Sequence, residues 1–230
     1  NRTVNQSVNI RLFFEGQLLH IVALMVLLFF VHSSFDIPGF EKGHFLGVST
    51  SIWVVISISD AVIHQVYVWF CWRAELHGQL LSKWFGSNSF RKYSLLFAIL
   101  IILRPISIFV LGWANRGTLA INYWAGFLVS LILLFGAVYC MYSVAHYFSF
   151  KRAVGIAHFE KKFQSEPLVR QGIFRWTPNA MYVFGFFTLW IPAFLFQSIA
   201  ALVVAGFSHI YIWVHFFATE KPDMLRIYGK

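Results

Sequence analysis

Six long apolar runs are the feature that most restricts how this chain folds. They cover approximately residues 10–32, 46–71, 94–114, 121–147, 180–196 and 198–217. A helix needs about 20 mostly apolar residues to cross the hydrocarbon core of a bilayer. The chain is 59% hydrophobic and 12% charged, whereas a soluble domain carries about 25% charged residues. The sequence therefore predicts an all-α, polytopic membrane helical bundle of about six spans.

Positive charge is distributed unevenly between the predicted loops. The formal net charge is +9, and all but three of the 18 Lys and Arg residues fall on one side of the spans. The exceptions are Lys42 and Arg116 on the other side and Arg104 within a span. Because Lys and Arg accumulate on the cytoplasmic side of membrane proteins, we expect both termini to be cytoplasmic. The distribution indicates contact with anionic lipid head groups and not with nucleic acid.

The last two runs form a short hairpin, preceded by a basic segment and followed by a charged tail. We divide the chain into N-terminal helices (residues 1–120) and a core (121–230) containing an interfacial segment (148–178), the hairpin (179–217) and the tail (218–230). Segment 148–178 interleaves Phe with Lys and Arg, as in a helix lying in the membrane interface. Arm 180–196 covers only roughly 25 Å at 1.5 Å per residue. We expect its cytoplasmic end to lie below the lipid head groups and to form a pocket covered by segment 148–178 and the tail.

Three ionisable residues fall within the first spans. Asp60 and His64 are four residues apart and share one face of a helix, and Arg104 precedes Pro105, which predicts a kink. Ionisable groups within spans are costly and are functional candidates by default. The pattern predicts either a structural ion pair of Asp60 with Arg104, with His64 beside it, or a path for a proton or substrate.

Histidines in or near the spans leave a haem protein open as an alternative. His20, His64, His146 and His209 fall there, but no spacing forces two of them to pair as axial ligands. We expect no metal site, since no His-x-x-x-His or carboxylate cluster occurs near the hairpin. Cys71 and Cys140 fall inside or at the edge of apolar runs, which predicts small buried side chains.

Polar and aromatic side chains gather at the two open ends of the hairpin. Asn179 and Tyr182 follow Pro178 at the start of one arm, and Glu220 and Asp223 follow the end of the other. Flat rings are supplied by Trp176, Tyr182, Phe217 and Tyr228. Aromatic belts and charged flanks are general in membrane proteins, but a belt does not need carboxylates. Carboxylates beside aromatic rings favour a site for a cationic ligand.

The residues around these ends resemble a known family of integral membrane methyltransferases. The family includes isoprenylcysteine carboxyl methyltransferases and phospholipid N-methyltransferases. The resemblance is carried by Leu168-Val169, Gly172-Ile173-Phe174, Trp176, Tyr182-Val183 and, upstream, Gly155-Ile-Ala-His158-Phe159. Glu220, Leu225 and Tyr228-Gly229 resemble the closing acidic motif. The similarity covers roughly residues 140–229, and the first three spans show none.

The resemblance implies an S-adenosylmethionine-dependent methyltransferase that acts on a membrane lipid or lipidated acceptor. It implies that Asn179, Tyr182 and Glu220 contact the cofactor and that Gly172 allows close backbone approach. Trp176 and Tyr228 are further cofactor-binding candidates. The family's Arg-His-Pro-x-Tyr is here Pro178-Asn179-Ala180-Met181-Tyr182, and its acidic pair is Glu220-Lys221. These departures favour a phospholipid amine head group over prenylcysteine as acceptor.

Methylation of an amine requires a general base, because the ammonium group must first lose a proton. The candidates for this catalytic role are Glu220, Asp223, His158 and His215. Three alternatives remain open: carboxyl methylation of the isoprenylcysteine type, a haem or electron-transfer membrane protein, and a non-enzymatic transporter or scaffold.

Overall fold

The computed structural model describes residues 9–229 and is almost entirely helical. Arg2 and Lys230, two of the basic residues behind the predicted topology, lie outside the described residues. The helices are α1 (Ile10–Phe13), α2 (Gln17–Ser33), α3 (Thr50–Gly78), α4 (Leu80–Phe85), α5 (Ser89–Ala114), α6 (Tyr123–Ser143), α7 (Phe150–Ala153), α8 (Phe187–Leu195), α9 (Ile199–His215) and α10 (Lys221–Tyr228). A small antiparallel hairpin of β1 (His44–Phe45) and β2 (Val48–Ser49) connects α2 to α3.

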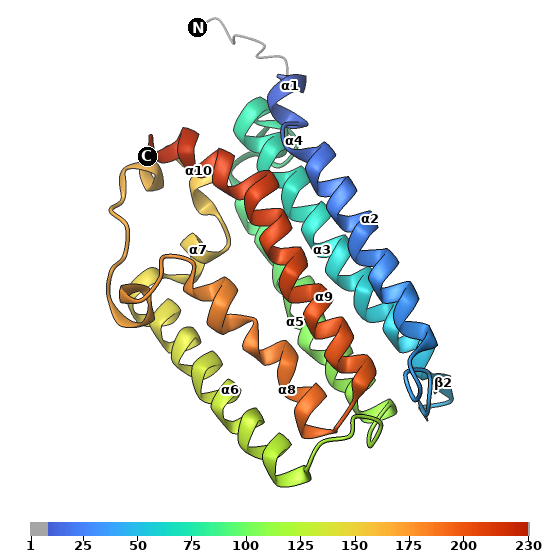
Figure 1. The fold of residues 1–230 in the computed structure, drawn as a ribbon. Coiled ribbons are helices and arrows are strands. Elements are labelled where there is room, and N and C mark those ends of the chain that lie inside the picture. The colour runs from blue at the N-terminus through green and yellow to red at the C-terminus, as the bar shows by residue number, and fades with distance from the viewer. Residues whose placement is uncertain (1–8, 230) are drawn as a thin grey trace, which may run out of the picture.

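Helix α9 runs through the middle of the bundle (Figure 1). It packs against α2, α3 and α5 on one side and against α8 on the other, and α6 covers α8. The contact face of α9 carries small residues, and Ala200, Ala201, Ala205 and Ser208 are fully buried. Small side chains let helix backbones approach closely within a membrane. Helices α1 and α10 lie at the same end of the bundle.

Within residues 9–229, five helical stretches are long and apolar enough to cross a membrane: Ile10–Asp36, Thr50–Gly78, Leu80–Ala114, Tyr123–Phe148 and Ile199–Tyr228. The predicted all-α membrane bundle is confirmed, with five full spans where about six were expected. The remaining run forms the shorter apolar helix Met181–Leu195. It ends early because Gln197, with a φ of 52°, turns the chain into α9.

The polar segment after α6 does not form the single interfacial helix that its composition predicted. Apart from the four-residue α7, it consists of short 3-10 turns at Ile156–His158, Lys161–Ser165 and Gly172–Arg175. Gly155 and Gly172 have φ values of 88° and 56°, in the left-handed region that interrupts a helix. The prediction was wrong because it weighed apolar content above these backbone breaks.

Asn115 joins three segments at the end of the bundle opposite α10. Its side-chain amide donates to the carbonyl oxygens of Gly39 (2.9 Å), Phe40 (3.1 Å) and Lys42 (2.8 Å). Its Oδ1 accepts from the hydroxyl of Ser198 (2.9 Å) and from the backbone N–H of Ala200 (3.0 Å). The Ser198 hydroxyl in turn caps α9. This fully buried side chain fixes the start of α9 and therefore the position of the hairpin.

Candidate functional site

The two open ends of the hairpin meet through Tyr182 and Glu220. The Tyr182 hydroxyl donates a hydrogen bond to Oε2 of Glu220. Both residues lie in π-helical turns, Met181–Gly185 before α8 and Phe216–Glu220 after α9. Such turns widen the helix by one residue and are frequent at functional sites. The structure thus brings together two of the residues expected to contact a cofactor.

Aromatic rings surround this contact. The Tyr182 ring meets Phe216, Trp213 and Phe186 edge-on, with ring centroids 5.8, 5.9 and 6.4 Å away. A carboxylate beside several aromatic rings favours a cationic group over an anionic or neutral one. The electrostatics of this end of the hairpin therefore fit a positively charged ligand.

A second cluster ties the tail to α3. The carboxylate of Asp223 is fully buried, and its Oδ2 accepts from Nε of Arg73 at 2.9 Å. Arg73 is also fully buried and donates to the carbonyl oxygens of Leu12 and Thr219. Because a buried arginine and carboxylate satisfy each other, Asp223 is held in place by the fold.

His158 connects the segment after α6 to the same cluster. Its Nε2 lies 3.6 Å from Oδ2 of Asp223, and its Nδ1 donates to the carbonyl of Gly155 at 3.1 Å. The imidazole stacks on Trp72 with centroids 4.2 Å apart and planes at 14°. A Cβ on Gly155 would come within 2.5 Å of the Trp72 ring, so only glycine allows this close approach. His158 and Asp223, two predicted catalytic candidates, therefore lie together in the described structure.

His215 lies in the interior at the end of α9, beside Trp72 and His20. It is 1% exposed, and neither of its ring nitrogens has a hydrogen-bond partner in the described structure. Its ring centroid is 5.9 Å from that of Trp72 and 6.3 Å from that of His20. Buried polar atoms are nearly always satisfied, so both ring nitrogens of His215 are available to a ligand or to water. The sequence placed His215 among four candidate bases without ranking them.

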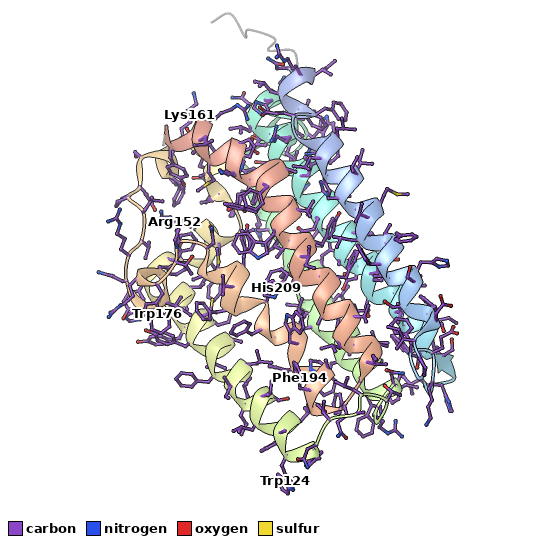
Figure 2. All side chains as sticks on the ribbon, viewed as in Figure 1. Trp124, Arg152, Lys161, Trp176, Phe194 and His209 are labelled. Carbon is purple, nitrogen blue, oxygen red and sulfur yellow. The ribbon has the colours of Figure 1, made fainter. Side chains whose placement is uncertain are left out.

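Two of the other cofactor-binding candidates, Trp176 and Gly172, lie against α6 in the described structure. Trp176 is 64% exposed and lies at the outer edge of the molecule near α6 (Figure 2), against Tyr139. Gly172 packs on α6, where a Cβ would come within 2.7 Å of the Ser143 hydroxyl. The close approach that Gly172 allows in this structure is therefore to α6.

Asn179 and Tyr228 stand at the margins of the site. The Asn179 carbonyl accepts from the backbone N–H groups of Tyr182 (3.0 Å) and Val183 (3.2 Å), so Asn179 begins the turn that carries Tyr182. Tyr228 lies near the end of α10, within electrostatic range of Arg152. Both residues frame the site from opposite arms of the hairpin.

Two of the histidines considered as haem ligands are engaged in hydrogen bonds. His20 Nδ1 donates to Gln17 Oε1 at 3.0 Å, and its Nε2 accepts from the Tyr211 hydroxyl at 2.7 Å. His209 Nδ1 accepts from the Trp190 indole at 2.9 Å. These rings serve as links between helices. The predicted burial of Cys71 and Cys140 is confirmed, and both are free thiols.

Asp60, His64 and Arg104 meet inside the bundle, on α3 and α5. They are 8%, 3% and 1% exposed. Among the described residues no ion pair joins Asp60 to Arg104, so the direct pair expected from the sequence is not formed. Instead, Nη1 of Arg104 contacts Nδ1 of His64 at 3.4 Å.

A hollow of about 390 Å³ opens beside the tail, lined by Glu15, Phe217, Lys221, Pro222, Leu225 and Arg226. Of these, Glu15 and Arg226 form an ion pair. This hollow belongs to the surface of α10 and does not include Tyr182 or His215. Tyr182 and Glu220 do not line this hollow.

The fold and site together define a polytopic helical membrane protein with a cation-favouring centre at the open end of its last hairpin. Residues 121–230 match the family model described as phospholipid methyltransferase. The predicted resemblance is confirmed and extends to α6, while residues 1–120 lie outside the match. No curated protein and no solved structure gave a match to the chain. The family match and the spanning helices indicate an integral membrane methyltransferase.

Proposed function

We propose that this protein uses S-adenosylmethionine to methylate the amine head group of a membrane phospholipid. The observation that carries the proposal is the contact of Tyr182 with Glu220, which closes the hairpin within the region that matches the methyltransferase family. We also infer that this end of the bundle, with both termini, faces the cytoplasm, where the methyl donor would enter.

The residues at this contact fit the proposed methyl donor. S-adenosylmethionine is a cation that supplies an electrophilic methyl group when bound. The Glu220 carboxylate would offset its positive charge, and the rings of Tyr182 and Trp213 would provide faces for a sulfonium or for adenine. Asn179, one turn before Tyr182, would add a polar contact. Binding would replace the hydrogen bond between Tyr182 and Glu220.

We infer that His215 acts as the general base, because it is buried and neither of its ring nitrogens has a partner in the described structure. A protonated amine cannot attack a methyl group until it has lost a proton. The unpartnered imidazole of His215 would take that proton, leaving the nitrogen lone pair free to form the new N–C bond as the C–S bond breaks. Its burial would keep water from competing with the amine.

The Asp223 cluster would position the site and take no part in proton transfer. Arg73 holds the Asp223 carboxylate at 2.9 Å, and His158 stacks on Trp72. Together they fix the tail and the segment after α6 over the open end of the hairpin. Proper alignment of nucleophile and methyl group is the main contribution that such an enzyme makes.

Carboxyl methylation of the isoprenylcysteine type is the main competing reaction. A carboxylate is already nucleophilic at neutral pH and needs no base. The buried, unpartnered His215 therefore favours an amine acceptor. The haem alternative is distinguished by a Soret band in the absorption spectrum of the purified protein.

The proposal is tested by two measurements on the intact chain in detergent and in cells. Calorimetry should show saturable binding of S-adenosylhomocysteine. Mass spectrometry of lipids from cells that express the protein should show phosphatidylethanolamine with added methyl groups, and cells without the protein should lack them. Absence of S-adenosylhomocysteine binding would sink the methyltransferase proposal. Binding of S-adenosylhomocysteine, together with methylation of prenylcysteine and not of phospholipid, would show that prenylcysteine is the acceptor.

A further inference from the structure

Arg104 is a buried guanidinium with unused hydrogen-bond donors. It lies on α5, is 1% exposed, and rests over the ring of Phe186 with 5.0 Å between the guanidinium carbon and the ring centroid. Nη1 donates to Nδ1 of His64, whereas Nε and Nη2 have no partner in the described structure. A charged arginine within a membrane span is costly unless it is compensated. The Nε and Nη2 donors of Arg104 are therefore available to an acceptor that is not part of the chain.

His64 adds a third donor to the same place. Because its Nδ1 accepts from Arg104, a neutral His64 carries its proton on Nε2. That nitrogen is also buried and without a partner. The hydroxyl of Ser208 on α9 is fully buried and unpartnered as well. The unpartnered donors of Arg104 on α5 and His64 on α3 favour an oxygen-rich anion.

Asp60 is the carboxylate nearest to this group. It lies within electrostatic range of Arg104, and one turn from His64 on α3. Its Oδ2 remains without a hydrogen-bond partner. The available carboxylate has therefore not taken up the donors of Arg104, although it offsets part of the charge.

The group lies next to the proposed methyl-transfer site and deeper in the bundle. Phe186 touches both the Arg104 guanidinium and the Tyr182 ring, at 5.0 and 6.4 Å. Ser208 and His215 are seven residues apart on α9, which places these two unpartnered groups on the same face of the helix, and Glu220 follows in the turn after α9. A phospholipid in the leaflet at this end carries its amine outermost and its phosphate below the amine. This order would place His215 at the amine and Arg104, which contacts Phe186 one turn after Tyr182, at the phosphate.

We propose that Arg104, with His64 beside it, binds the phosphate of the phospholipid acceptor. The inference rests on the proposed function, because it assumes an amine phospholipid as substrate. It assigns a binding role to α3 and α5, which lie outside the family match. Arg104 would hold the phosphate through its Nε and Nη2 donors, in the two-pronged manner that guanidinium groups favour.

The first measurement detects lipid binding without methyl transfer. Native mass spectrometry measures how much lipid each protein retains. Two lipids with the same acyl chains are compared, short-chain phosphatidylethanolamine and diacylglycerol. The proteins are the parent, Arg104→Gln and Arg116→Gln. Arg116 is an exposed arginine just after the C-terminal end of α5 and serves as the matched control. We expect the parent and Arg116→Gln to prefer the phospholipid at least tenfold, and Arg104→Gln to lose that preference. An unchanged preference in Arg104→Gln, or none in the parent, overturns the inference.

The second measurement separates this inference from the proposed function. In mixed micelles with S-adenosylmethionine, Arg104→Gln should raise the KM for phosphatidylethanolamine at least tenfold, with the Kd of S-adenosylhomocysteine within twofold of the parent. Phosphate-dependent binding without any methyl transfer would reject the proposed function and retain the phosphate site. An equal rise in KM for a phosphate-free long-chain amine would reject the phosphate site.

Two further variants guard against misfolding. Arg104→Lys keeps the charge and loses the planar guanidinium, and His64→Phe keeps a ring and removes the Nε2 donor. Both should weaken the phospholipid preference less than Arg104→Gln. If Arg104 only pins α5 to α3, Asp60→Asn and Arg104→Gln would lower thermal stability alike, while the variants that fold would retain the parent's lipid preference. That result would overturn the inference.

Discussion

The hydroxyl of Tyr182 donates to the carboxylate of Glu220 across 38 residues of sequence. The two side chains come from opposite arms of the last hairpin, and each sits in a π-helical turn. The shorter arm ends at Leu195, whereas α9 continues through the Phe216–Glu220 turn into α10. The lengths of the two arms thus determine where the candidate site forms.

Removing either partner of this contact should weaken cofactor binding. Glu220→Gln keeps the shape and removes the charge, and we expect the Kd of S-adenosylhomocysteine to rise at least tenfold, or about 1.4 kcal/mol. Tyr182→Ala should also weaken binding sharply, and Tyr182→Phe should weaken it less. Calorimetry provides the measurement, and Glu166→Gln, in the loop after α7, is the control. Parent-like binding by Glu220→Gln and Tyr182→Ala would show that the site lies elsewhere.

Replacing His215 should slow turnover and spare cofactor binding. A general base typically contributes about 10²- to 10⁴-fold to the rate. We therefore expect His215→Gln to lower kcat for phosphatidylethanolamine by at least 100-fold, with little change in the Kd of S-adenosylhomocysteine. His44→Gln, in β1 at the other end of the bundle, should behave as the parent does. A kcat within threefold of the parent for His215→Gln would remove His215 from the mechanism.

Breaking the buried ion pair should destabilise the fold. Loss of one partner of a buried pair costs about 3–5 kcal/mol, because the other charge is left uncompensated. Asp223→Ala should therefore lower the detergent unfolding temperature strongly, and Asp36→Ala, at an exposed position, should not. The double variant Arg73→Met with Asp223→Leu should regain much of the loss. If the double variant is no more stable than Asp223→Ala, the ion pair is not the cause.

A methyl group at Gly155 should disturb the stacking of His158 on Trp72. Gly155→Ala meets the Trp72 ring at 2.5 Å and also places alanine at a φ of 88°. Gly117→Ala isolates the backbone effect, because Gly117 has a φ of 73° and nothing within 4 Å of its added Cβ. We expect Gly117→Ala to cost about 1 kcal/mol and Gly155→Ala to cost more and to lower activity. Equal losses in the two variants would mean that the contact with Trp72 has no importance.

The hydrogen bonds of Asn115 should make a large contribution to stability. Asn115→Ala leaves several buried carbonyl and N–H groups unpaired, at about 1–3 kcal/mol for each group that water cannot reach. Asn122→Ala removes only the N-terminal cap of α6, at about 1 kcal/mol. Thermal unfolding in detergent should rank Asn115→Ala well below Asn122→Ala. The reverse order would contradict the assignment of Asn115 as the residue that joins the three segments.

The sequence was informative where structure depends on local pattern. Apolar run lengths predicted the spans, and the residues flanking the last hairpin placed Tyr182 and Glu220 in one expected site, where the structure brings the two side chains into contact. The sequence was uninformative where distant segments satisfy each other. Arg73 counted only as a basic residue at the end of a span, and nothing near it in the chain indicated Asp223 as its partner. Asn115 resembled an ordinary loop residue for the same reason.

The two arms of the last hairpin differ greatly in length, and this difference affects the lipids around the protein. Met181–Leu195 covers about 22 Å and Ile199–Tyr228 about 45 Å at 1.5 Å per residue. Lipids beside the shorter arm must thin or tilt to match it. Under the proposed function, bilayer thickness would then set how readily a neighbouring lipid moves toward the centre of the protein, and lipid chain length would regulate turnover.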